Sequence, residues 1–467
     1  MKKHILFIRT LFLLLPFVAT AQKGNRQDHE RSNTNGVFHN TAPAHLYDII
    51  LSRPAATSVT ISVMCNEELS GYIVYGKSLS ALSGKTQKYQ FESGRPLHTE
   101  LNGLEPDTRY YYRFVYSKPG AGASQQSAPG FFHTQRKAGG KFVFTIQADS
   151  HLDENSSPGM YTQTLVNMAA DSADFLVDLG DTWMADKYRP DYKESLKQYI
   201  AQRYYFGLLC RSSPLFLTLG NHDGESGRGN RPGEENMTSW ATATRKLYYA
   251  NPRPGSFYSG SEDENYYAWE WGDALFIVLD PFRYTRDQRN PWQRTLGEKQ
   301  YNWLKETLQK SKAPLKLVFI HNLTGGADQK GIGRGGAEAA KFFEWGGWNA
   351  DSTAGFAANR PGWERPIHDL LVQYKVNAVF HGHDHLFVKQ ELDGIVYQLL
   401  PQPGATRYGN INSAGEYGYC SGKILNAPGY LRVSVEKGKA LVEYVQTDIS
   451  QQQKNREILY SYTILSE

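Results

Sequence analysis

The stretch VNAVFHGHDH (residues 376–385) places three histidines directly behind an apolar run. The whole chain has only 13 histidines in 467 residues, so this local density is unusual. The run Val376–Phe380 is typical of a buried strand, and the histidines follow where that strand is expected to end. A lone histidine in such a place is commonly a core or surface residue, so the rest of the chain must show whether these bind a metal.

Similar apolar runs recur along the chain, with amphipathic helical patterns between them. The runs are KFVFTIQ (141–147), DFLVDL (174–179), PLFLTL (214–219), ALFIVL (274–279) and LKLVFI (core 316–320). Continuous apolar strands that alternate with helices indicate sheets buried on both faces. Alternating segments near the C-terminus predict a closing antiparallel region. The predicted fold class is therefore α/β, with two packed β-sheets flanked by helices.

Polar side chains follow five of these predicted strands, at the point where each strand ends. They are Asp149-Ser150-His151, Gly180-Asp181, Gly220-Asn221-His222-Asp223, His321 and Gly382-His383-Asp384-His385. In α/β folds the carboxyl ends of the strands gather at one rim, where ligands bind. Each motif alone has an ordinary explanation as a helix cap, a turn or a core histidine. Five coincidences at one rim are improbable, so the sequence predicts a metal site of mixed oxygen and nitrogen ligands.

The first 21 residues have the features of a cleaved secretory signal. Lys2 and Lys3 precede an apolar stretch, and Ala19-Thr20-Ala21 forms a small-residue cleavage site. A membrane anchor is disfavoured because the apolar stretch is short and contains Arg9 and Pro16. No later stretch approaches the roughly 20 apolar residues of a spanning helix. The protein is therefore predicted to be exported, to the periplasm or the medium, without stable membrane insertion.

Cysteine content and charge exclude other classes of protein. The three cysteines, Cys65, Cys210 and Cys420, leave at least one unpaired, and their spacing fits no zinc pattern. We therefore expect no disulfide framework. A net charge of +4 over 467 residues, with no basic run, gives little support to nucleic-acid binding except as a possible substrate.

The N-terminal part of the mature chain differs from the rest in polarity and in the spacing of its apolar residues. Residues 22–45 are polar and aperiodic and predict a flexible lead-in. Residues 46–136 form short alternating segments with turns between them, which predict a small all-β sandwich. In LNGLEPDTRYYYRFVY (101–116) a tyrosine on the alternating face is suited to close a sandwich corner by bonding back to the chain. This segment resembles a fibronectin type III module, and Gln135–Gly140 is expected to be a hinge.

The order of the five motifs resembles that of the calcineurin-like metallophosphoesterases: Asp-x-His, Gly-Asp, Gly-Asn-His-Asp/Glu, His and Gly-His-x-His. All five occur in that order across residues 149–385, within an expected catalytic domain of residues 141–467. The resemblance implies two metal ions. One would be held by Asp149, His151 and His385, the other by Asn221, His321 and His383, with Asp181 bridging the two.

The implied activity is hydrolysis of phosphate esters by in-line attack of a metal-bridging hydroxide. Bound cations lower the pKa of water from 15.7 to about 7 and neutralise charge on the phosphoryl oxygens. The mixed ligand set suits Fe, Zn or Mn and does not distinguish among them. The resemblance and elimination give His222 the role of facing the substrate, where it would donate to the leaving oxygen or stabilise the transition state. Asp223 is the candidate that orients this imidazole, and a solvated loop residue is its alternative reading.

The residues at two positions distinguish this chain from one subclass of the family. Purple acid phosphatases are similar in pairing a fibronectin-like module with this catalytic fold, but they carry a metal-binding tyrosine three residues after the bridging aspartate. Met184 occupies that position here, and His151 is present where they have another residue. Many other family members have Asp or Asn at the position of Met184.

The long segment between His321 and Val376 contains glycines, tryptophans, Arg334 and Arg360. It predicts either a wall over the site, with Arg334 or Arg360 gripping phosphate, or an insert packed on the edge of the sheet. A second wall is possible after Asp223, where Arg228 and Arg231 lie in a glycine-rich loop.

Three functional hypotheses follow from these motifs. The first is an exported phosphomonoesterase. The second is a phosphodiesterase or nucleotidase acting on nucleotides or lipid head groups, which the motifs do not separate from the first. The third is a non-catalytic surface binding protein, which is disfavoured because every ligand of the two metals is present. The sequence does not indicate an oligomeric state.

Overall fold

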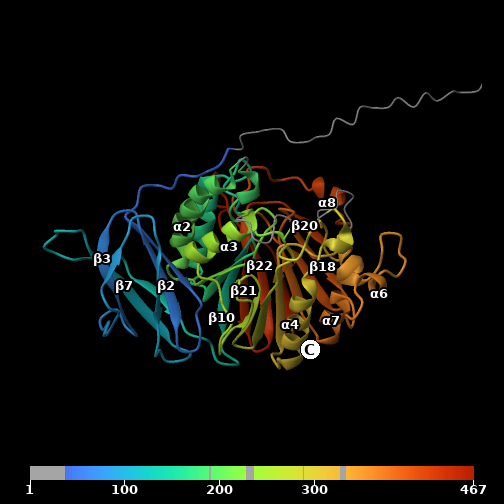
Figure 1. The fold of residues 1–467 in the computed structure, drawn as a ribbon, viewed down its shortest axis with the longest axis horizontal. Coiled ribbons are helices and arrows are strands. Elements are labelled where there is room, and N and C mark those ends of the chain that lie inside the picture. The colour runs from blue at the N-terminus through green and yellow to red at the C-terminus, as the bar shows by residue number, and fades with distance from the viewer. Residues whose placement is uncertain (1–36, 189–190, 228–235, 288, 327–332, 467) are drawn as a thin grey trace, which may run out of the picture. The chain divides into compact units, whose positions relative to one another are not determined.

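The computed structural model describes residues 37–188, 191–227, 236–287, 289–326 and 333–466 (Figure 1). The predicted signal peptide (1–21), most of the lead-in (22–45), Arg228 and Arg231 lie outside the described residues. None of the helices in the described part is long and apolar enough to cross a membrane.

The expected α/β architecture is confirmed, and two large sheets form its centre. The nine-stranded sheet runs in the order β23 (Ile458–Leu465), β22 (Lys439–Gln446), β21 (Gly429–Glu436), β10 (Phe142–Gln147), β11 (Phe175–Asp178), β12 (Leu215–Leu217), β1 (Tyr47–Ser52), β2 (Val59–Cys65) and β6 (Leu97–Leu101). The eight-stranded sheet runs β13 (Ser259–Gly260), β14 (Tyr267–Trp271), β15 (Ala274–Val278), β16 (Leu315–Ile320), β17 (Ala378–His381), β19 (Ile395–Leu399), β18 (Phe387–Leu392) and β20 (Lys423–Leu425).

Each predicted apolar run is a strand of one of these sheets. β10, β11 and β12 pair in parallel, as do β15, β16 and β17, and the closing strands β21, β22 and β23 are antiparallel. Parallel strands deliver their carboxyl ends to the same edge, and this places the five polar motifs at one rim of the sheets.

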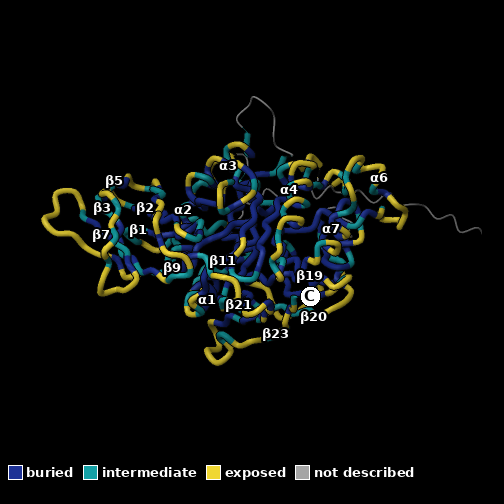
Figure 2. The backbone as a smooth tube through the Cα atoms, turned by 90° about the horizontal axis from the view of Figure 1, so that it is seen from below, coloured by how far each residue is buried: buried dark blue, intermediate teal, exposed yellow. Residues whose placement is uncertain are grey.

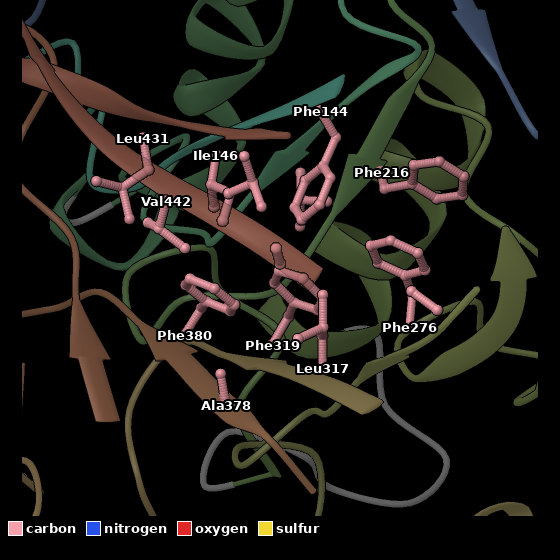
Figure 3. Close-up of a cluster of buried hydrophobic side chains, with 14 of the residues drawn as sticks. Phe144, Ile146, Phe216, Phe276, Leu317, Phe319, Ala378, Phe380, Leu431 and Val442 are labelled. Carbon is pink, nitrogen blue, oxygen red and sulfur yellow. The ribbon is translucent and has the colours of Figure 1, made fainter. Parts of the chain in front are cut away.

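The main hydrophobic core lies between the two sheets. Phe144 and Ile146 of β10 belong to the same buried cluster as Leu317 and Phe319 of β16 and Phe380 of β17 (Figure 3). Alternate residues of the same strands face outward and are apolar too, because helices cover the outer faces. Buried residues accordingly follow the paired sheets through the molecule (Figure 2).

Two pairs of helices cover the outer faces. The helices α1 (Pro158–Ala170) and α2 (Leu196–Cys210) contribute to the cluster that contains Leu176 and Leu217 of the nine-stranded sheet. The helices α4 (Gly297–Lys310) and α7 (Ile367–Gln373) contribute to the cluster that contains Val318 and Val379 of the eight-stranded sheet. The remaining helices are α3 (Met237–Tyr248) and the four-residue α5 (Phe343–Gly346), α6 (Phe356–Asn359) and α8 (Ser413–Glu416).

The segment predicted to be a small sandwich is all-β. Its second sheet runs β4 (Gly84–Lys85), β3 (Leu69–Gly76), β7 (Arg109–Ser117) and β8 (Gln125–Gln126), with β5 (Tyr89–Phe91) on β3 and β9 (Gly130–His133) on β7. A shared core joins this sheet to β1, β2 and β6. The hydroxyl of Tyr110 accepts a hydrogen bond from the backbone N–H of Glu105 at 3.0 Å, so a tyrosine does bond back to the chain there. The kinship with fibronectin type III stays a prediction.

This sandwich shares a sheet with the α/β part of the chain. β1 pairs in parallel with β12, with Ser52 opposite Leu215. The expected hinge also bonds to the chain around it, because Arg136 makes two hydrogen bonds with Asp174 and the side chain of Gln135 donates to Glu270 O at 3.0 Å. The division at residues 136–141 stays a prediction.

The three cysteines are free, as expected, with Cys65 and Cys210 buried.

A buried arginine strengthens the contact between the sandwich and the helices. Arg203 of α2 has no exposed surface, and its guanidinium donates to Asp48 Oδ1 of β1 (2.8 Å from Nε) and to Ser62 Oγ of β2 (3.1 Å). It also donates to the carbonyl of Tyr248 at the end of α3. The charge of this arginine is thus fully compensated within the core.

Replacing Arg203 with methionine should destabilise the protein, because Asp48 would remain as a buried carboxylate without its cation. We expect a loss of about 3–5 kcal/mol in the free energy of unfolding, measured by urea denaturation. The matched control is Arg95→Met, which removes an exposed partner of Glu92 and should leave stability unchanged. Equal stability of the two variants would contradict an anchoring role for Arg203.

Candidate metal centre

The five polar motifs follow five strand ends that lie at one rim. Asp149 and His151 follow β10, Asp181 follows β11, and Asn221 follows β12, all in neighbouring strands of one sheet. His321 follows β16, and the remaining two histidines follow its neighbour β17 in the facing sheet. Because the two sheets pack face to face, their loops meet above the shared core.

The first group of side chains consists of Asp149, His151 and His385. Asp149 Oδ1 lies 3.5 Å from His385 Nε2 and 3.8 Å from His151 Nε2. The two imidazole rings are nearly perpendicular, with centroids 4.6 Å apart. Three potential ligand atoms therefore face one point.

The second group contains Asp181, His321 and His383, and Asn221 joins it. His321 Nε2 lies 3.1 Å from Asn221 Oδ1, 3.2 Å from His383 Nδ1 and 3.4 Å from Asp181 Oδ2. Asp181 Oδ2 is also 3.7 Å from His151 Nε2 of the first group. The carboxylate of Asp181 thus lies between the two groups.

The separations between these ligand atoms suit two bound cations better than they suit hydrogen bonds among the side chains. Ligands about 2.1 Å from a tetrahedral ion lie about 3.4 Å apart, close to the separations seen here. One imidazole nitrogen, with either a single lone pair or a single proton, cannot satisfy three partners, as His321 Nε2 would have to do. Among the described residues, Asp149 Oδ1 and His151 Nε2 are buried without a hydrogen-bond partner. A bound cation would satisfy both atoms.

Hydrogen bonds on the far side of two imidazoles aim their Nε2 atoms at the centre. His321 Nδ1 lies 2.8 Å from the carbonyl oxygen of Leu179, and His151 Nδ1 lies 3.2 Å from Asp153 Oδ2. A carbonyl or carboxylate partner assigns the proton to Nδ1, which leaves the Nε2 lone pair free for a metal. Asp153, which the sequence analysis missed, also receives a hydrogen bond from Lys187 Nζ at 3.1 Å.

The backbone at the centre is strained. Five of the seven predicted ligands have positive φ, a conformation that costs non-glycine residues on the order of 1–3 kcal/mol. They are Asp149 (60°), His151 (57°), Asp181 (53°), His383 (80°) and His385 (57°). Gly220 is required for a different reason, since a Cβ there would lie 2.1 Å from the backbone nitrogen of Asp181. The loops are therefore held in conformations that serve the placement of side chains.

The charges of the two groups are strongly coupled. Burial opposes ionisation of Asp149 and Asp181, but neighbouring histidines, chiefly His385 and His321, hold the pKa of each carboxyl below its usual range. Burial lowers the pKa of His321, but the charge of Asp181 outweighs it and raises that pKa to about 10. Burial lowers the pKa of His151, but the nearby carboxylates of Asp149 and Asp153 outweigh it and raise that pKa to about 9. The buried carboxylates thus favour positive charge at the centre, as metal sites do.

His222 lies beside the first group, with its ring centroid 6.1 Å from that of His151. Its backbone N–H donates to Asp181 Oδ1 at 2.9 Å. Its Nδ1 lies 2.9 Å from Asp186 Oδ1, and about a quarter of the side chain is exposed. The carboxylate that orients this imidazole is therefore Asp186.

The expectation that Asp223 orients His222 is wrong. The Asp223 carboxylate is buried and accepts four backbone N–H groups, from Gly220 at 2.7 Å, Thr182 at 2.9 Å, Trp183 at 3.0 Å and Asp181 at 3.1 Å. It fastens the loop after β11 to the loop after β12. Adjacency in the sequence suggested the orienting role, but consecutive residues of this loop point in different directions.

Arg360 does not line the centre. Its guanidinium donates to Glu344 Oε2 at 2.6 Å and to Trp292 O at 2.6 Å, and it packs beside the rings of Trp292 and Trp363. The second reading of this segment, an insert packed on the sheet, thus describes the part around Arg360. The reason is local: Glu344 is buried and needs a cation.

Arg334 lies next to the centre. Its Nη1 is 3.2 Å from Asp384 Oδ1, and Asp384 lies between the ligand candidates His383 and His385. The guanidinium covers the ring of Tyr417 at 3.8 Å, while the hydroxyl of Tyr419 donates to Asp384 Oδ2 at 2.7 Å. Of the two predicted arginines, the structure brings only this one to the rim.

The chain is similar to known proteins in sequence and in fold. The model of the calcineurin-like phosphoesterase family matches residues 142–387, more than half of the chain. A phosphoenolpyruvate phosphatase from Allium cepa is 23% identical over 366 residues, which cover 73% of this chain and 63% of the relative, less than two thirds of its length. Purple acid phosphatase 23 from Arabidopsis thaliana is 23% identical over 396 residues, or 78% of this chain and 75% of the relative.

Two solved structures have a similar fold. The structure of PhoD aligns with a TM-score of 0.65 at 15% identity and covers 94% of this chain and 92% of its own. A purple acid phosphatase from yellow lupin (Lupinus luteus) seeds aligns with a TM-score of 0.59 at 14% identity, covering 90% and 74% respectively. At these identities the likeness concerns the fold alone.

Replacing Asp223 with asparagine should loosen both loops, since an amide NH2 would face two of the four backbone N–H groups. We expect the free energy of unfolding to fall by about 2–4 kcal/mol in urea denaturation. Asp351→Asn is the control, because Asp351 bonds Thr353 in an exposed turn, and it should leave stability unchanged. An Asp223→Asn protein as stable as the parent would contradict the fastening role.

Proposed function

The chain belongs to the calcineurin-like phosphoesterases, a family of metal-dependent hydrolases of phosphate esters, and we propose that it is an exported dinuclear phosphatase acting on phosphate monoesters. The observation that carries this proposal is the carboxylate of Asp181, whose Oδ2 lies within 3.7 Å of imidazole nitrogens from both ligand groups. One carboxylate between two ligand groups suits two cations held close together.

In this proposal each group holds one metal. The first would be held by Asp149, His151 and His385, the second by Asn221, His321 and His383, and Asp181 would contribute to both. Once bound, two cations supply Lewis acidity, generate a nucleophile from water at neutral pH and neutralise phosphoryl charge. Iron, zinc and manganese all suit this donor set.

His222 protonates the leaving oxygen. Asp186 at Nδ1 stabilises the protonated imidazole and leaves Nε2 as the atom that delivers the proton. The partial exposure of His222 allows a substrate to reach it, while its backbone bond to Asp181 fixes its position relative to the centre.

Arg334 contributes charge to the same rim. Burial is the main cause of the lowered pKa of His383, and the positive charges of His321 and Arg334 lower it further. Asp384 and Tyr417 fix its direction. We assign to Arg334 the binding of a phosphoryl oxygen, for which a fixed guanidinium is well suited.

The names of the relatives favour monoesters, since both curated relatives are called phosphatases. Export is supported by the signal-like residues 1–21, which lie outside the described part of the chain.

Removal of metal should abolish activity. We expect the purified protein to hydrolyse 4-nitrophenyl phosphate and to contain about two metal ions per chain by elemental analysis. Dialysis against a chelator should remove both metal and activity, and return of Fe, Zn or Mn should restore them. Bis(4-nitrophenyl) phosphate serves as the comparison, and faster hydrolysis of this diester would contradict the monoesterase proposal. Activity that survives complete loss of metal would contradict the metal assignment itself.

Replacing Asp186 with asparagine should weaken acid catalysis by His222 without removing metal. We expect kcat for phenyl phosphate to fall by about 10²-fold, in the range for loss of general acid catalysis. The metal content should stay that of the parent. Asp191→Asn, which caps the nearby turn Tyr192–Ser195, is the control and should leave kcat unchanged. Unchanged kcat in Asp186→Asn would show that His222 does not depend on this carboxylate.

A further inference from the structure

A single short turn connects the residues that support the centre. The 3-10 turn η1 (Ala185–Lys187) begins four residues after the bridging residue Asp181. Asp186 contacts His222 from this turn, and Lys187 contacts Asp153, which in turn orients His151. Asp153 is also held by the backbone N–H of Asn155 at 2.9 Å, so it is His222 whose direction depends on the position of η1.

The turn has few bonds of its own. A 3-10 segment of three residues is not stable in isolation, and its N-cap Met184 provides no side-chain hydrogen bond. Its start is held by the backbone N–H of Met184, which donates to Gln198 Oε1 of α2 at 2.7 Å. Its middle is held by the backbone N–H of Asp186, which reaches the carbonyl of His222 at 3.3 Å.

The end of η1 is held by a remote part of the chain. The ring of Tyr188 stacks on that of Phe38, with centroids 4.0 Å apart and an interplanar angle of 19°. The hydroxyl of Tyr188 donates to Asn40 Oδ1. Between these two residues, the backbone N–H of His39 donates to the carbonyl of Leu152 at 2.8 Å. Residues 38–40 thus bind both the end of η1 and the residue after His151.

We propose that Phe38–Asn40 is a clasp that positions η1, and through it the pair Asp186–His222, for protonation of the leaving group. This inference rests on the proposed function. The segment belongs to the part expected to be a flexible lead-in, yet its contacts are with catalytic loops more than 110 positions away in the sequence. An aromatic stack of this kind contributes about 0.5–1.5 kcal/mol, enough to bias a turn of three residues.

The clasp predicts a leaving-group effect that general destabilisation does not produce. In the full mature chain, Phe38→Ala should lower kcat for phenyl phosphate by about 2- to 12-fold, the range that corresponds to loss of one aromatic pair. For 4-nitrophenyl phosphate, whose leaving group needs little protonation, kcat should change by less than about twofold. KM for both esters should be unchanged, and Phe38→Trp, which restores a ring, should recover kcat.

Two controls make the test specific. Phe131→Ala removes an aromatic ring that lies against Arg109 in the sandwich, and it should leave both kcat values unchanged. In an Asp186→Asn background, Phe38→Ala should cause no further loss, because the two changes act on one unit. An equal fall of kcat on both esters, or additive losses in the double variant, would overturn the clasp.

A second measurement does not depend on activity. Amide hydrogen exchange at residues 184–188 should be faster in Phe38→Ala than in the parent, since the end of η1 would be released. Unchanged exchange there would overturn the clasp even if the parent is an active phosphatase. Faster exchange in a parent that hydrolyses neither ester would support the clasp and refute the proposed function.

Discussion

The centre of this protein depends on keeping one carboxylate, that of Asp181, buried between two groups of imidazoles. Burial alone would favour its neutral form, and neighbouring histidines reverse that preference. Much of the surrounding chain serves to hold it. Asp223 accepts its backbone N–H, and Gly220 leaves room for its backbone. Asp178 Oδ1 holds the flanking loop by accepting the backbone N–H of Gly180 and the hydroxyl of Thr182. The positive φ at Asp181 persists because these contacts outweigh its cost.

The sheets and the ligand candidates were accessible from the sequence because both follow from local patterns. Six apolar runs gave six strands, and parallel pairing then required their polar ends to meet. The chain needs no long-range information to place His321 at a strand end, since the run LKLVFI and the following His are contiguous. The motif order added the expectation that these ends form two groups, and the distances around His321 Nε2 agree with it.

The supporting residues were not accessible, because their partners are chosen by three-dimensional contacts. Asp223 is next to His222 in the sequence, whereas Asp186 is 36 residues away from it. The path of the loops nevertheless turns Asp186 toward the imidazole and Asp223 toward backbone N–H groups. The sequence offered no reason to prefer Arg334 over Arg360 as a residue of the site, but Arg360 pairs with the buried Glu344. The buried role of Arg203 could not be predicted for the same reason, because its partner Asp48 is about 150 residues away in the sequence.

The carboxylate that orients His222 lies on the short turn η1, and the residue that precedes this turn, Met184, has an apolar side chain. A methionine side chain cannot accept a hydrogen bond from an imidazole N–H as a carboxylate or amide does. Met184 is buried, and only its backbone contributes, to Gln198. His222 is oriented by Asp186, two residues further on, which lies within the turn η1. A carboxylate on so short a turn is only as well placed as the turn itself. The contacts of Tyr188 with Phe38 and Asn40 at the end of η1 therefore bear on how well Asp186 is placed against His222.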